Sequence, residues 1–115
     1  DEFVCVPMAQ LPENLKITPH TYLVLTTRGS NIDIEGMAPL LDTPAKYIGV
    51  SGSKRRWITT RKALIEQGIS EERLNQVHSP IGLELNAETP EEIAVSIMAE
   101  IIMVRNGGTG TKMKI

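Results

Sequence analysis

The chain has 115 residues, 41% of them hydrophobic and 23% charged, which is the balance of one ordinary globular domain and excludes a disordered chain. A formal net charge of −2 gives no overall attraction to nucleic acid or anionic lipid, and one Trp, two Tyr and one Phe are too few for a base-stacking platform. The single cysteine excludes an internal disulfide, and no apolar run reaches the roughly 20 residues that cross a bilayer. We therefore expect a cytoplasmic protein that binds neither nucleic acid nor membranes.

The first predicted elements are two strands separated by a connection. Residues 3–6 form a short apolar run that predicts a buried strand, with Cys5 as a structural thiol inside it. Residues 7–20 contain three prolines and predict a connection with at most one helical turn. Residues 22–27 are rich in branched and aromatic side chains and predict a central strand.

Helices and strands alternate through the middle of the chain. Apolar side chains at helical spacing predict a helix over residues 34–41, which two nearby prolines are expected to keep short. Residues 46–50 predict a third strand, and residues 54–67 a long helix ended by Gly68. Ser70 then predicts the N-cap of a second short helix.

The last predicted helix has the clearest start. Thr89 supplies an N-cap, Pro90 a first-turn proline and Glu92 the partner of a capping box. Residues 93–104 carry a wide apolar stripe that requires a covered surface. Residues 107–115 are rich in glycine and basic side chains and predict a flexible tail.

This order of elements predicts an α/β fold with a mostly parallel sheet and flanking helices. The chain begins at Asp1 without an initiator methionine and enters a predicted strand almost at once. We therefore expect a fragment of a larger domain.

Glycines and hydroxyl side chains lie between the third predicted strand and the long helix. Residues 49–56 read Gly-Val-Ser-Gly-Ser-Lys-Arg-Arg. Free amides in the first turn of a helix and the helix dipole favour an anion such as phosphate, and glycine lets the anion approach closely. The residues predicted to contact it are Gly49, Ser51, Gly52, Ser53, Lys54 and Arg55. The alternative is that Ser53 only caps the helix and the basic side chains are solvated, because the pattern is neither a Walker loop nor GxGxxG.

Two other loops are candidates for the same site. Arg28 and Gly29 follow the end of the central strand, and the carboxyl ends of parallel strands line one edge of a sheet. His78 lies in a later loop, where it could contact a ligand, exchange a proton or hold the loop by a hydrogen bond. No carboxylate or nucleophile pairs with it at an interpretable spacing, so no catalytic residue is predicted. No His/Cys cluster predicts a metal site.

Four motifs follow one another in the chain, at residues 26–29, 45–56, 77–83 and 87–97. In sequence and order they resemble the C-terminal domain of the xanthine dehydrogenase accessory protein (XdhC) family. The resemblance implies a Rossmann-like domain over residues 1–106, in a factor that binds the molybdenum cofactor (molybdopterin) and assists its sulfuration. It implies delivery of that cofactor to xanthine dehydrogenase or a related molybdenum hydroxylase, with a cysteine desulfurase as a further partner. We therefore expect an accessory factor and not a catalyst.

The chain departs from this family pattern at its start. Rossmann-like domains normally begin with a strand and a glycine-rich turn, and no such turn precedes Phe3, so the domain is expected to be incomplete on its N-terminal side. An exposed sheet edge would favour a homodimer. Two alternative functions stay open: an NAD(P)-binding domain of an oxidoreductase, and a structural dimerisation module built on the last helix.

Overall fold

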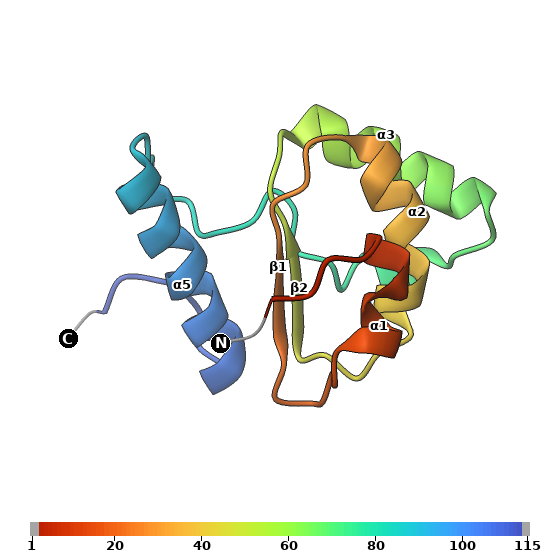
Figure 1. Ribbon diagram of the computed structural model, residues 1–115. Coiled ribbons are helices and arrows are strands. Elements are labelled where there is room, and N and C mark those ends of the chain that lie inside the picture. Colours follow the sequence, from red (N-terminus) through yellow and green to blue (C-terminus); the bar gives the residue numbers. More distant parts are fainter. Residues whose placement is uncertain (1–2, 114–115) are drawn as a thin grey trace. The chain divides into compact units, whose positions relative to one another are not determined.

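The computed structural model describes residues 3–113 (Figure 1). The chain divides into two compact units, Asp1–Pro80 and Ile81–Ile115.

The first unit contains a parallel sheet with helical connections. Strand β1 (Tyr22–Leu25) pairs with β2 (Tyr47–Val50) so that Tyr22 lies opposite Tyr47 and Leu25 opposite Val50. Helix α2 (Ser30–Leu41) connects the two strands, and α3 (Lys54–Glu66) follows β2. The short turns η1 (Met8–Gln10) and α1 (Leu11–Asn14) precede β1, and α4 (Glu71–Leu74) follows α3. The predicted α/β class with parallel strands is confirmed.

The sheet continues beyond β2 through one residue. His78 forms a parallel bridge with Gly49. Its N–H donates to the Ile48 carbonyl, and its carbonyl accepts from the Val50 N–H, both at 2.9 Å. Strand β2 is therefore paired on both sides.

An aliphatic core fills the space between one face of the sheet and its helices. Leu25 and Val50 are neighbours in the ladder and point to this face, where both are buried. Met37 and Leu40 of α2 and Leu64 of α3 are fully buried in the same cluster. Burial of each such side chain stabilises the fold by roughly 1.5–3 kcal/mol, so this cluster holds α2 and α3 against the sheet.

Helix α2 begins earlier than its apolar spacing predicts, at Ser30, and runs through Pro39 to Leu41. The early start has a tertiary cause, because Asp33 in the first turns is buried and bonded to groups outside the helix. The proline lies in the last turn, where it removes a single backbone hydrogen bond while its neighbour Leu40 packs in the core.

The strand predicted for residues 3–6 is wrong, since those residues form no ladder in the described part of the chain. Phe3 is 90% exposed, and Cys5 is an exposed free thiol instead of a buried one. Apolar composition indicates only that a segment can enter a sheet. Pairing also needs a neighbouring backbone that accepts it.

The second unit is built on α5 (Pro90–Asn106), and the predicted capping box is present. The Thr89 hydroxyl accepts from the Glu92 amide, and the Glu92 carboxylate accepts from the amides of Thr89 and Glu88 at 3.0 Å. Gly107, in the left-handed conformation, ends the helix.

Side chains of α5 also hold the loop that precedes it. The buried Glu100 carboxylate accepts from the Gly82 amide at 3.1 Å, and the Ser96 hydroxyl donates to the Leu83 carbonyl at 2.7 Å. The predicted apolar stripe is covered only in part, since Ile93, Ala94, Met98 and Ile102 are exposed, as is Val95 outside the stripe. Among residues 3–113, no helix is long and apolar enough to cross a membrane.

The capping box predicts how stability changes in acid. The backbone hydrogen bonds from Thr89 and Glu88 lower the pKa of Glu92 below its usual value. A carboxyl with a lowered folded-state pKa stabilises the fold above its unfolded pKa, about 4.3, and loses that contribution as the pH falls through the folded value. Glu92→Gln should therefore flatten the acid side of the stability curve, measured by chemical unfolding between about pH 6 and pH 3. Glu91→Gln removes a charge from the same turn without a capping bond and should preserve the slope; equal flattening in both variants would contradict this account.

A second prediction concerns a buried hydroxyl in α3. Thr60 is fully buried, and its Oγ1 has no hydrogen-bond partner within the described residues. Thr60→Val keeps the shape and removes this polar group, so it should raise the free energy of unfolding by about 1 kcal/mol in a denaturant titration. Thr59→Val is the matched control, because the exposed Thr59 hydroxyl donates to the Arg55 carbonyl. The control should change stability by less than about 0.5 kcal/mol; a destabilised Thr60→Val would refute the assignment.

Candidate functional site

Two strand-to-helix turns lie at one edge of the sheet. Because β1 and β2 are parallel, the turn 26–29 and the turn 51–53 both follow carboxyl ends of strands. The Ser51 amide donates to the Leu25 carbonyl at 2.8 Å and ties the second turn to the end of β1. Each turn leads directly into the amino terminus of a helix longer than ten residues, α2 or α3.

The turn before α3 presents exposed polar groups. Ser51 is half-buried, whereas Gly52, Ser53, Lys54 and Arg55 are exposed. The Ser53 hydroxyl accepts from the Arg56 amide at 3.1 Å, so the predicted N-cap is present. This cap uses the amide of Arg56 and leaves the amides of residues 54 and 55 without intrahelical partners, because they precede the first intrahelical bonds.

The third basic side chain of this run points inward. Nη2 of Arg56 lies 2.8 Å from Oδ2 of Asp33, and Nη1 donates to the Thr27 carbonyl at 2.9 Å. The Thr27 hydroxyl donates to Oδ1 of Asp33 and accepts from Arg56. Asp33 is only 1% exposed and the Arg56 side chain 20%. Removing one partner of such a buried pair typically costs about 3–5 kcal/mol.

Sequence reasoning misses both members of this pair, because it gives neither Arg56 nor Asp33 a role. One signal is available for Arg56: it lies four and eight residues before Thr60 and Leu64, the buried positions of α3. Helical spacing therefore places Arg56 on the inward face and Lys54 on another.

The turn passes directly over the Arg56 side chain at Gly52. This glycine has a φ of +136°, and a Cβ there would lie 3.1 Å from Cδ of Arg56. The backbone conformation therefore favours glycine, and a Cβ would also require the Arg56 side chain to shift by a few tenths of an ångström.

The turn before α2 is more open. Arg28 is exposed, and Gly29 is the N-cap residue of α2 with no side-chain cap. A Cβ at Gly29 would meet nothing within 4 Å. The structure thus brings Arg28 and Gly29 to the same sheet edge as residues 51–55.

Gly49 and His78 belong to the sheet and not to these turns. Gly49 is buried in the ladder between Val24 and His78. The His78 ring stacks on Tyr47, with ring centroids 4.7 Å apart and planes at 14°. Tyr47 begins β2, whereas the glycine-containing turn follows its end. Contact of either residue with a ligand stays a prediction.

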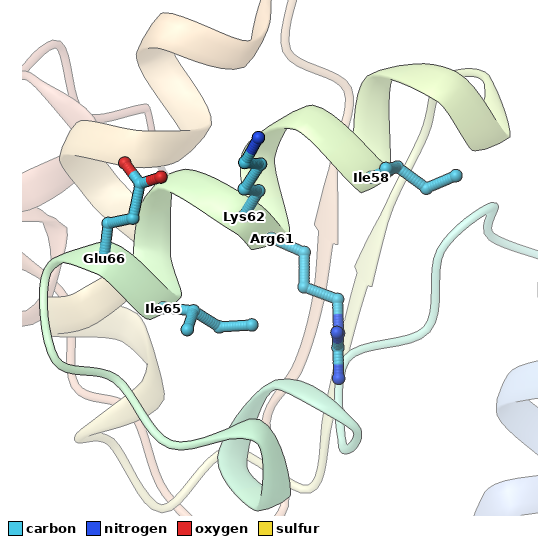
Figure 2. Close-up of a pocket in the computed structure, with 5 residues that line it drawn as sticks. All are labelled: Ile58, Arg61, Lys62, Ile65 and Glu66. Carbon is cyan, nitrogen blue, oxygen red and sulfur yellow. The ribbon is translucent and has the colours of Figure 1, made fainter.

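Two hollows lie elsewhere on the helices. One, of about 390 Å³, lies along α3, where Ile58 and Ile65 form an apolar surface with Arg61, Lys62 and Glu66 around it (Figure 2). The other, of about 340 Å³, lies on α5 and is lined by Ala94, Val95, Met98, Ala99 and Ile102. Neither has the convergent polar groups that orient a small ligand. Within residues 3–113, no group of three or more His, Cys, Asp or Glu side chains could hold a metal ion.

Known proteins resemble this chain over most of its length. YqeB of Escherichia coli (strain K12), an uncharacterized protein, is 36% identical over 101 residues, which are 88% of this chain and 18% of YqeB. A Bacillus subtilis (strain 168) protein named as a probable xanthine dehydrogenase subunit is 32% identical over 105 residues, 91% of this chain and 30% of that protein. The molybdenum cofactor insertion chaperone PaoD of E. coli K12 is 27% identical over 90 residues, 78% of this chain and 28% of PaoD.

A solved structure also resembles this chain. The crystal structure of a xanthine dehydrogenase from Bacillus halodurans superposes with a TM-score of 0.72 at 31% identity, covering 95% of this chain and 30% of that one. This chain therefore spans less than a third of the length of each of these relatives. Residues 3–101 match the XdhC Rossmann domain. The chain belongs to the XdhC Rossmann domain family.

Proposed function

We propose that this chain is a molybdenum-cofactor-binding domain of an accessory factor for xanthine dehydrogenase-type molybdenum hydroxylases. Its relation to PaoD, named as a molybdenum cofactor insertion chaperone, supports this assignment. The domain would bind and orient the cofactor and would supply no catalytic residue.

The observation that carries the proposal is the exposed amino terminus of α3 with two exposed cations beside it. Molybdopterin carries a phosphate, and amide, hydroxyl, ammonium and guanidinium donors are the groups that bind phosphate in proteins. Ser51, Ser53, Lys54 and Arg55 supply such groups from the β2 turn. The carboxylate of Asp33 does not oppose an anion here, because Arg56 neutralises it.

The remaining contacts are assigned by position. Arg28 and the Gly29 backbone would reach the ligand from the β1 turn, and the Gly52 backbone from the β2 turn. Gly49 and His78 lie deeper in the sheet. They would contact the cofactor only if part of it extended past the turns. This donor set suits the phosphate end of the cofactor. It includes no thiolate for the molybdenum, since none of these residues is a cysteine.

The same reasoning extends to partners. A factor that delivers this cofactor must meet a molybdenum hydroxylase, and one that assists sulfuration must meet a sulfur donor such as a cysteine desulfurase. We further propose a homodimer in the cytoplasm.

Two alternatives have some support. An NAD(P)-binding domain of an oxidoreductase would use the same phosphate chemistry, but the sequence has no GxGxxG turn and no acid-base pair for hydride transfer. A structural dimerisation module is favoured by one observation, the exposed Val95, Met98 and Ile102 on α5.

The proposal predicts which cations bind the cofactor. Lys54→Ala combined with Arg55→Ala should weaken molybdopterin binding at least about tenfold, because a hydrogen bond to a charged group contributes about 1.5 kcal/mol or more. Anaerobic titration of the chain with molybdopterin, followed by fluorescence or calorimetry, measures the affinity.

The control removes the same charge elsewhere. Lys46 precedes β2 at the opposite end of the strand, and Lys62 lies in the middle of α3. Lys46→Ala combined with Lys62→Ala should leave the affinity within about twofold, as expected for screened charges. Unchanged binding in the Lys54/Arg55 variant would refute the site, and an unaltered chain that does not bind molybdopterin would refute the function.

Tight NADH binding with hydride transfer would support the oxidoreductase alternative, and a ligand-independent dimer that binds neither molecule would support the structural one.

A further inference from the structure

We propose that the buried Arg56–Asp33 pair sets the spacing between the two turns of the anion site, so that both are positioning residues and neither touches the ligand. The role in ligand binding rests on the proposed function. The role in holding the turns does not, and the two are tested separately below.

The pair joins three elements that the chain brings together from distant positions. Arg56 lies in the first turn of α3, Asp33 in the first turns of α2, and Thr27 just after β1. One guanidinium bonds both the Thr27 carbonyl and the Asp33 carboxylate, at 2.9 and 2.8 Å. The Thr27 hydroxyl closes the cluster by its bond to Asp33. The turn 27–29 is therefore fastened to the start of α3 by side chains.

The second turn rests on the same guanidinium. A Cβ at Gly52 would lie 3.1 Å from Cδ and 3.3 Å from Nη1 of Arg56, so the backbone of this turn packs against the side chain. The Ser53 cap meets the backbone amide of Arg56 in the same helical turn. Residues 51–53 therefore lie close to the Arg56 side chain, and we expect a change in that side chain to reach them as well as residues 27–29.

Arg56 differs from its two basic neighbours in its contacts. Lys54 and Arg55 are exposed at the sheet edge, whereas the Arg56 side chain bonds to Thr27 and Asp33. Its Nε is buried and has no hydrogen-bond partner in the described part of the chain. A site assembled from two turns holds its ligand only when both are placed within about 0.5 Å of the required geometry. The internal cation supplies that placement, and the two exposed cations supply the binding.

The key variant is Arg56→Lys. An ammonium keeps the charge near Asp33 but cannot reproduce the planar fork that reaches two elements at once. We expect the hydrogen-bonded amides at the two turns, Ser51 to the Leu25 carbonyl and Asp33 to the Gly29 carbonyl, to exchange at least about fivefold faster without ligand, while amides in α4 stay within about twofold. Arg55→Lys is the matched control, because it makes the same chemical change at an exposed neighbouring position, and it should leave exchange in both turns unchanged. Unchanged exchange in Arg56→Lys would overturn the positioning role whatever the ligand proves to be.

Binding provides the second readout. Arg56→Lys should weaken molybdopterin binding about tenfold, whereas the Lys46/Lys62 alanine variant should stay within about twofold, with the folding of both verified by circular dichroism at the titration temperature. Retained affinity in Arg56→Lys, together with lost affinity in the Lys54/Arg55 alanine variant, would overturn the inference and leave the proposed function standing. Unchanged affinity in the alanine variant, together with faster exchange in Arg56→Lys, would overturn the proposed site and leave the positioning role standing.

A double variant separates positioning from stability. Replacing a buried ion pair by apolar side chains of similar size is often neutral or stabilising, so Arg56→Met combined with Asp33→Leu should recover most of the stability that Arg56→Met alone loses. The affinity should stay at least about tenfold below that of the unaltered chain, because the link to Thr27 is still absent. An affinity that returned together with the free energy of unfolding would show that the pair is merely structural.

Discussion

Parallel pairing of β1 with β2 is the constraint on which the rest of the structure depends. It places both carboxyl strand ends, and the amino termini of both following helices, at one edge of the sheet. The helices can take this position because Leu25 and Val50 lie side by side and present one apolar face to Met37 and Leu64. Hydrophobic burial on that face and polar groups at that edge are two results of the same register.

Local signals allowed part of this fold to be predicted from the sequence. The capping box at Thr89 and the N-cap at Ser53 depend on residues three positions apart, and both are present. The strands around Leu25 and Val50 carry branched and aromatic side chains in runs that are too short for helices. The strand at residues 3–6 failed because sheet pairing depends on a partner, and an apolar run contains no information about one.

In the candidate site, too, features set by neighbouring residues could be predicted, whereas features that depend on a distant partner could not. The position of its exposed residues at the end of β2 could be predicted, because a turn between a strand and a helix leaves the first helical amides free, and their contact with a ligand stays a prediction. Asp33 could not, since its partner Arg56 is 23 residues away and no local pattern connects them. His78 was expected in a loop, yet its backbone extends the sheet beside Gly49, an arrangement that requires the whole first unit to fold. Family membership assigns a Rossmann domain over residues 3–101, which contains both turns.

Because Arg56 points inward and pairs with Asp33, only two of the three basic residues at positions 54–56 contribute positive charge to the surface. Lys54, Arg55 and Arg56 are three equal charges in the printed sequence, but successive residues of a helix point about 100° apart, and the third is already neutralised by an internal carboxylate. Exchanging lysine and arginine at position 54 or 55 keeps an exposed positive charge, so the electric field outside the turn is preserved. Exchange of Arg56 for lysine changes the bonds to Asp33 and Thr27 and leaves the field outside the turn nearly unchanged. Two sequences with identical basic runs can therefore differ in function, according to whether an aspartate stands where Asp33 stands.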